Sequence, residues 1–139
     1  MQPKLYYVFD ETLDPLAQLS EHFMAKEFKC SDNSRVIVLN KALIDLLEEI
    51  RTHFNAPVII NSGYRTVQYN SQLKESAPGS QHTLGNAADI RVTGHMPTEV
   101  YQYLDSSYPN SLGLGIYSTF VHVDVRESKS RFDKRTAKK

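Results

Sequence analysis

The 139-residue sequence lacks several features that mark other classes of protein. It has one cysteine, Cys30, so no internal disulfide can form and the fold must depend on packing and on any metal it binds. It has no internal repeat and no low-complexity segment. No apolar run approaches the roughly 20 residues that a membrane-spanning helix requires. A disulfide-bonded scaffold, a repeat protein and a helical membrane protein are therefore excluded.

The sequence also has no net charge of either sign. Sixteen Lys and Arg residues balance sixteen Asp and Glu residues, so no overall field attracts nucleic acid, and we expect no nucleic-acid partner. The exception is the segment 127–139, which holds six basic and two acidic residues. We expect this segment to be a flexible, basic, polar tail that follows a single domain over residues 1–126.

Helical and strand patterns follow one another along the chain. Apolar residues recur at helical spacing over 14–28 and 40–55, and Pro97 lies in the first turn of a third predicted helix over 97–108. A weaker helical pattern covers 67–76. Strands are predicted over 57–61, 87–92, 112–117 and 120–126. This order predicts an α+β fold with an antiparallel sheet and flanking helices.

Two segments place histidine near aspartate in unusual surroundings. In SQHTLGNAADI, the residues between His82 and Asp89 include Gly, Asn and two Ala, which are small enough to let the backbone approach another group closely. In FVHVDVR, strand alternation places His122 and Asp124 on one face and three valines on the other. A carboxylate within an apolar run such as AADIRV needs a partner, because an unpaired buried charge is costly.

Two histidines and one aspartate are ligand types that catalytic zinc accepts, with a fourth position open to water. Zinc-bound water ionises near neutral pH and can attack a carbonyl carbon. The spacing of His82, Asp89 and His122 is not specific by itself, since many proteins contain a histidine and an aspartate seven residues apart. The assignment of a function therefore depends on the motifs around these residues.

Three such motifs occur in the order INSGYRT, GSQHTLGNAADI and GLGIYSTFVHVDVR. Together they resemble the zinc D-Ala-D-Ala carboxypeptidase family, which includes D,D- and L,D-endopeptidases of bacterial cell walls and phage endolysins. The resemblance runs from about Leu19 to Phe132. It implies a fold of the hedgehog/DD-peptidase type. It also implies a zinc metallopeptidase that hydrolyses an amide bond in the peptide stem or cross-link of peptidoglycan.

The resemblance also implies roles for individual residues. It implies that Zn²⁺ is bound by His82, Asp89 and His122. Arg65, in SGYR, is the implied catalytic anchor for a substrate carboxylate or a developing oxyanion, which suits a planar, permanently charged guanidinium. The neighbouring residues that would line a substrate-binding site are Tyr64, Ser80 and Gln81. Packing or capping of the loop would explain these three equally well.

The sequence departs from the family at the general base. Many members carry Glu or Asp three residues before the last histidine ligand, or His two residues before it, and these positions are Thr119 and Phe120 here. Asp124 remains as the catalytic base, as an orienter of His122, or as a partner of Arg126 alone, and the sequence leaves these roles open. The alternative function is a catalytically silent, zinc-containing module that binds cell wall or belongs to a phage particle.

The first residues, MQPKLYYVFDETLD, lack the apolar core of a signal peptide. For an enzyme that acts on the cell wall, this favours synthesis in the cytoplasm and release by a phage- or lysis-type route. The choice between carboxypeptidase and endopeptidase depends on loop shapes that the sequence does not define.

Overall fold

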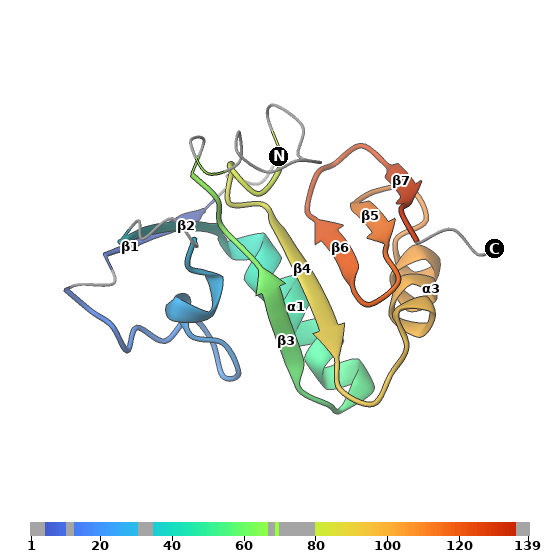
Figure 1. Ribbon diagram of the computed structural model, residues 1–139, viewed down its shortest axis with the longest axis horizontal. Coiled ribbons are helices and arrows are strands. Elements are labelled where there is room, and N and C mark those ends of the chain that lie inside the picture. The colour runs from blue at the N-terminus through green and yellow to red at the C-terminus, as the bar shows by residue number, and fades with distance from the viewer. Residues whose placement is uncertain (1–4, 11–12, 31–34, 67–68, 70–79, 136–139) are drawn as a thin grey trace.

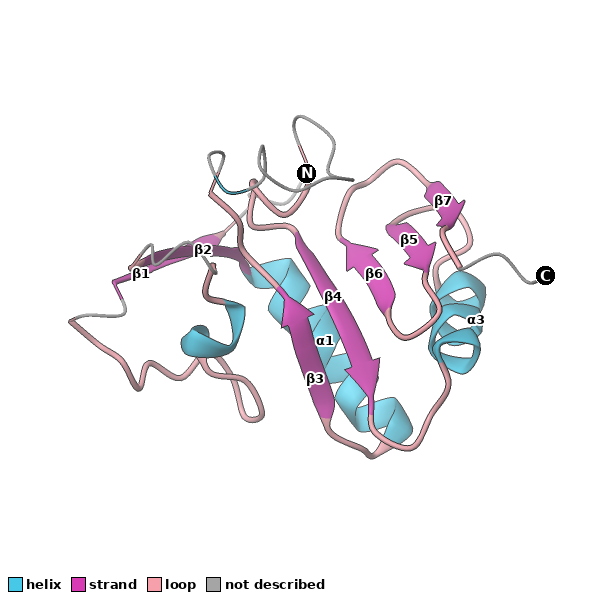
Figure 2. Cartoon of the chain, viewed as in Figure 1, coloured by secondary structure: helices cyan, strands magenta, loops and turns pink. Residues whose placement is uncertain are grey.

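The computed structural model describes residues 5–10, 13–30, 35–66, 69 and 80–135 (Figure 1). In chain order, its elements are β1 (Tyr6–Asp10), the 3-10 helix η1 (Ala25–Phe28), β2 (Val36–Asn40), α1 (Lys41–Phe54), β3 (Val58–Ser62), β4 (Ala87–Val92), α3 (Pro97–Ser107), β5 (Gly113–Ile116), β6 (Val121–Asp124) and β7 (Ser130–Asp133). Helix α1 runs behind β3 and β4, and α3 packs beside β5 (Figure 2).

The main sheet has the strand order β3-β4-β6-β5-β7, and β1 and β2 form a separate two-stranded sheet. Neighbouring strands are antiparallel except for β5 and β7, which are parallel. The fold is therefore mixed α+β, as predicted. The helices predicted over 40–55 and 97–108 and the four predicted strands are all present, with ends that shift by no more than two residues. The weak helix predicted over 67–76 falls, apart from Tyr69, outside the described residues.

Helix α1 supplies the apolar layer beneath the sheet. It begins where Asn40 Oδ1 accepts a hydrogen bond from the N–H of Ala42 (2.9 Å), and it ends at Asn55, which takes a left-handed φ of 50°. Its buried residues are Leu43, Ile44, Leu46, Leu47 and Ile50. Each large apolar side chain buried in this way contributes about 1.5–3 kcal/mol. No helix in the described part of the chain is both long and apolar enough to span a bilayer.

Strands β4 and β6 have two different faces. Residues such as Ile90 and Val123 lie on the face toward the core and are at most 1% exposed. The opposite face carries Asp89, His122 and Asp124, which are also buried. The antiparallel register places Asp89 directly opposite His122. The pairing of these two strands therefore brings together side chains that are 33 residues apart in the sequence.

Two glycines of β5 make room on this polar face. Gly113 lies opposite Asp124, and a Cβ at Gly113 would overlap the Asp124 carboxylate. Gly115 lies opposite His122, and a Cβ there would overlap the ring of Phe132. The alternation in LGLGIY thus places apolar side chains in the core and leaves the other face of β5 open for a buried carboxylate and an aromatic ring.

The segment 14–24 forms turns, so the prediction of a helix there is wrong, and only η1 is helical in this region. The Glu48 carboxylate on α1 accepts hydrogen bonds from Ser20 Oγ (2.5 Å) and from the N–H of His22 (2.7 Å). The N–H of Ser20 donates to the carbonyl of Phe23 (3.2 Å). Contacts to α1 therefore satisfy polar groups that a helix would otherwise satisfy, and they override the local pattern.

The C-terminal segment also differs from the predicted flexible basic tail, because part of it forms β7 at the edge of the main sheet. The Arg131 guanidinium donates to the backbone carbonyls of Leu112 (2.7 Å) and Tyr108 (2.8 Å). The ring of Phe132 fills the space over Gly115. Side-chain contacts that the charge pattern does not reveal therefore hold this strand in place.

Gly115→Ala should lower the free energy of unfolding by about 1–3 kcal/mol, because the added methyl group overlaps the Phe132 ring and must displace β7. In a Phe132→Ala background the overlap is gone, so Gly115→Ala should destabilise the protein much less. Chemical denaturation of the wild type, both single variants and the double variant measures this coupling. Purely additive effects would contradict the packing of Phe132 on Gly115.

Candidate metal centre

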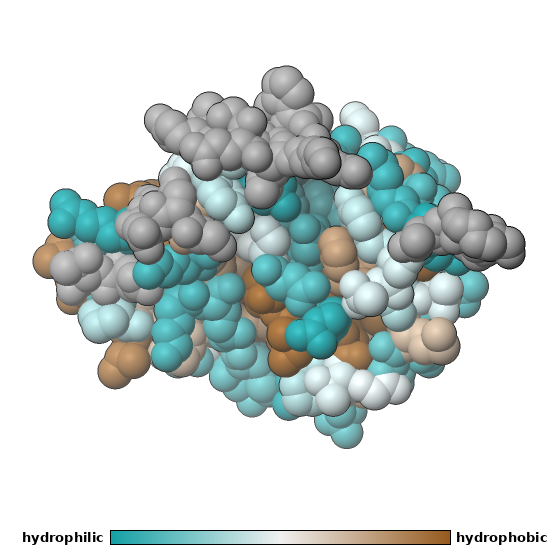
Figure 3. Space-filling model, viewed as in Figure 1, coloured by the Kyte–Doolittle hydropathy of each residue, from teal (hydrophilic) through white to brown (hydrophobic). Residues whose placement is uncertain are grey.

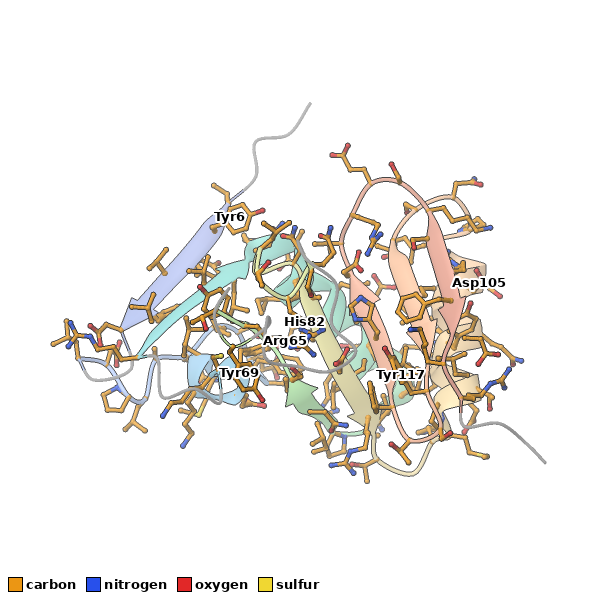
Figure 4. All side chains as sticks on the ribbon, turned by 45° about the horizontal axis from the view of Figure 1, so that its top comes forward. Tyr6, Arg65, Tyr69, His82, Asp105 and Tyr117 are labelled. Atoms are coloured by element: carbon orange, nitrogen blue, oxygen red, sulfur yellow. The ribbon has the colours of Figure 1, made fainter. Side chains whose placement is uncertain are left out.

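His82, Asp89 and His122 each offer one ligand atom, and these atoms all lie within 4.8 Å of one another. The three residues are 3%, 7% and 8% exposed, so the cluster is buried. Asp89 comes from β4 and His122 from β6, while the loop before β4 supplies His82. In Figure 4, His82 and Arg65 lie side by side, and Tyr117 lies toward the β5–β6 side of the sheet.

The loop that carries His82 is closed by its own hydrogen bonds. Ser80 Oγ accepts from the N–H of His82 (3.1 Å), and the Gln81 carbonyl accepts from the N–H of Asn86 (3.0 Å). Gly85 takes a φ of +75° and passes so close to the backbone of Val38 that a side chain there would clash. This close passage explains the glycine between His82 and Asp89.

The protonation state of His82 follows from its neighbours. Its Nδ1 lies 2.7 Å from the carbonyl oxygen of Gly63, and a carbonyl can only accept a hydrogen bond, so Nδ1 carries the proton. Its Nε2 lies 3.2 Å from Asp89 Oδ1 and faces the cluster, where it is the nitrogen that a bound metal would contact in place of a proton. A backbone carbonyl that fixes the tautomer in this way is typical of histidine metal ligands.

His122 lies between two carboxylates. Its Nδ1 is 3.0 Å from Asp89 Oδ1, and its Nε2 is 2.7 Å from Asp124 Oδ2. Asp124 is fully buried, and the Arg126 side chain donates to its two oxygens through Nε (2.7 Å) and Nη2 (2.8 Å). The pairing of Asp124 with Arg126 that the sequence allowed is therefore present, and it coexists with the hydrogen bond to His122.

The charges in the cluster shift the pKa values of its members. Burial would raise the pKa of Asp89, but hydrogen bonds from His122 and His82 outweigh it and hold that pKa far below its usual range. Asp124 behaves in the same way because of His122 and Arg126. Burial lowers the pKa of His122, but hydrogen bonds to Asp124 and Asp89 outweigh it, so this pKa is raised. Both carboxylates are therefore ionised near neutral pH.

The cluster opens into a pocket of about 260 Å³. It is lined by Arg65, Ser80, Gln81, His82, Asp89, Tyr117, His122, Arg126, Phe132 and Lys134. The lining residues that sequence reasoning missed are Tyr117, Arg126, Phe132 and Lys134. Tyr64 does not line this pocket but an adjoining one of about 210 Å³, which Arg65 also lines.

Arg65 and Thr119 have different relations to the cluster. The Arg65 side chain is 14% exposed, and its Nη2 lies 3.5 Å from Asp89 Oδ2. Thr119, at the position of the usual family base, is exposed and lines a separate pocket of about 330 Å³ near the end of β4. Figure 3 shows apolar surface around the end of β4, on the face of the molecule seen in Figure 1. Arg65 thus lies at the candidate metal cluster, whereas Thr119 does not line the pocket into which this cluster opens.

Two oriented imidazoles and one ionised carboxylate, buried together beside a pocket, are a group that could hold a metal ion, and their donor atoms suit Zn²⁺. The sequence matches the Peptidase M15 family model over residues 18–124, and the chain belongs to this family of metallopeptidases. This match confirms the resemblance to the zinc D-Ala-D-Ala carboxypeptidases. No curated protein and no solved structure matches the chain.

Purified protein should bind about one equivalent of zinc and melt at a higher temperature with the metal, because a ligand that binds only the folded state stabilises it. Asp89→Asn and His82→Ala should abolish both effects, since each removes a donor from the cluster. His95→Ala is the matched control, as His95 lies outside this cluster. Elemental analysis and thermal denaturation provide the measurements, and unchanged zinc content in His82→Ala would contradict the site.

Zinc affinity should fall as the pH is lowered through the raised pKa of His122. Because Asp124 and Asp89 raise this pKa, metal-free His122 keeps its second proton at a pH where free histidine has lost it, and zinc must displace that proton. Below this pKa, the dissociation constant should increase about tenfold for each pH unit. Competition with a zinc chelator at several pH values checks the slope, which a constant affinity across the series would refute.

Proposed function

We propose that the protein is a zinc-dependent peptidase with a hedgehog/DD-peptidase type of fold, which hydrolyses an amide bond in the peptide stem or cross-link of bacterial peptidoglycan. The observation that carries this proposal is the convergence of His82, Asp89 and His122 at a pocket that also holds Arg65, in a chain of the Peptidase M15 family. Such an enzyme would reach the cell wall after a phage- or lysis-type release.

Zinc, when bound, supplies an ionised water near neutral pH and polarises the scissile carbonyl. The chain contributes by holding the proton of each imidazole on the nitrogen that faces away from the metal. His82 Nδ1–H donates to the Gly63 carbonyl, and His122 Nε2–H donates to the Asp124 carboxylate. Arg65 supplies a fixed positive charge at the edge of the cluster. Its role in this proposal is to bind a substrate carboxylate or the oxyanion that develops in the transition state.

The geometry favours Asp124 as a positioning residue over Asp124 as the general base. Its carboxylate accepts hydrogen bonds from Arg126 on both oxygens and from His122 Nε2 on one of them. It is completely buried and is not among the residues that line the pocket. A carboxylate with these partners and a strongly lowered pKa is a poor proton acceptor. It is well placed to keep the His122 ring oriented toward the metal.

Ser80, Gln81 and Tyr64 complete the proposed substrate contacts. Ser80 and Gln81 line the metal pocket, although both also close the loop that carries His82. Tyr64 lines the adjoining pocket, and Arg65 lines both. An extended peptide that passes Arg65 would therefore contact both pockets.

The second candidate is a catalytically silent zinc module that binds cell wall. It is favoured by one observation: Asp89, a metal ligand, is the only carboxylate among the described residues that line the metal pocket. Incubation of zinc-loaded protein with purified peptidoglycan separates the two functions. New amino groups that a chelator and His82→Ala both abolish support the peptidase, whereas binding without release supports the silent module.

Asp124→Asn should weaken zinc binding by about 10- to 100-fold, since the amide no longer holds His122 as the carboxylate does. If Asp124 only positions His122, saturating zinc should restore most of kcat. A kcat that stays low while zinc affinity is unchanged would instead identify Asp124 as the base. Asp133→Asn is the matched control, because Asp133 forms an exposed ion pair with Arg135 at the same two-residue spacing.

A further inference from the structure

We propose that Lys134 is a specificity-determining residue that binds a second carboxylate of the substrate, across the metal cluster from Arg65. This inference rests on the proposed peptidase function and deepens it. It assigns the substrate as a peptide with acidic groups on both sides of the amide bond that is held at the metal. Lys134 lies beyond the segment that matches the family model, which ends at residue 124.

The strand order places the two cations on opposite sides of the candidate ligands. Arg65 follows β3 at one edge of the main sheet, and Lys134 follows β7 at the other edge. Asp89 on β4 and His122 on β6 lie between them. All four residues nevertheless line one pocket of about 260 Å³. A peptide bound across the metal cluster would therefore meet a positive charge in each direction.

Lys134 is held at the pocket even though it lies close to the end of the chain. Its backbone N–H donates to the carbonyl of Ile116 on β5 (2.8 Å), which continues the contact between β5 and β7. Two residues earlier, Phe132 lines the same pocket, and its ring centroid lies 5.5 Å from that of His122. Strand alternation places Phe132 and Lys134 on the same side of this segment. The sheet thus positions the backbone of Lys134, and its exposed side chain lines the pocket.

The charge balance of the pocket indicates what Lys134 binds. Arg126, Arg131 and Arg135 are each paired with an aspartate, whereas the ammonium of Lys134 has no acidic partner among the described residues. Among the described residues, the pocket lining contains three cationic side chains, those of Arg65, Arg126 and Lys134, and one carboxylate, that of Asp89. Asp124 pairs with Arg126 and Asp89 lies next to Arg65, so Lys134 is the cation of this described lining without an acidic partner. A metal ion would make this excess of positive charge larger. An anionic group of the substrate is the complement that this lining favours.

Stem peptides in acid and amide forms test this inference. The probes are a free-acid stem pentapeptide, L-Ala-γ-D-Glu-diaminopimelate-D-Ala-D-Ala, and versions in which one carboxylate at a time is amidated. The enzymes are zinc-loaded wild type, Lys134→Gln and Lys129→Gln. Lys129 is the matched control because it is an exposed lysine of the same segment that does not line the pocket. Measured kcat/KM and calorimetric Kd are compared for each pair.

In the wild type, amidation of either bound carboxylate, the one at Arg65 or the one at Lys134, should lower kcat/KM by about tenfold, the effect of losing one charge-assisted hydrogen bond. Lys134→Gln should lower kcat/KM for the free acid by a similar factor and should no longer distinguish the free acid from one of these two amidated peptides. Lys129→Gln should behave like the wild type. Discrimination that persists unchanged in Lys134→Gln would overturn the inference, and unchanged zinc content in all three proteins excludes an effect on the metal.

A failure of the proposed function gives a different result. If wild-type protein cleaves neither the peptides nor intact peptidoglycan, the peptidase proposal fails, but the Kd values still test Lys134. A preference for the free acid in binding that Lys134→Gln removes would support the carboxylate contact in a silent module. Equal Kd values for acid and amide forms in every protein would overturn it.

Discussion

The burial of charge on one face of β4 and β6 is the constraint on which the rest of the structure depends. Asp89, His122 and Asp124 lie almost out of contact with solvent, and each would be costly to bury alone. They lie in a row of ion pairs in which positive and negative side chains alternate. Arg65 is at one end of this row and Arg126 is at the other. Each member has a partner, so the row is stable only as a whole.

This row dictates the residues around it. Gly113 is required opposite Asp124, because any side chain there would displace the carboxylate. Gly63 brings its carbonyl to His82, and a Cβ at Gly63 would lie 2.8 Å from Phe28. These two glycines therefore leave space for polar groups. Large apolar residues remain on the other face of the sheet and on α1.

The cluster could be predicted from the sequence because its members are tied to strong local signals. The period of two in FVHVDVR fixed which residues share a face, and the motifs linked His82 and Asp89 to His122. Strand β7 could not be predicted in this way, since contacts of Arg131 and Phe132 with distant residues hold a polar sequence in a sheet. The turns before η1 were missed for the same reason, because Glu48 on α1 organises them.

The pocket is built from two parts of the chain, one of which is strand β7. The candidate metal ligands lie within residues 18–124, which match the family model, while one wall of the pocket comes from a short strand beyond that segment. In the main sheet, β7 pairs with β5 alone, as the last strand at its edge. Replacement of this strand would leave every other strand pairing intact. The preference for one peptide over another can thus diversify at the C-terminus while the hydrolytic chemistry stays the same.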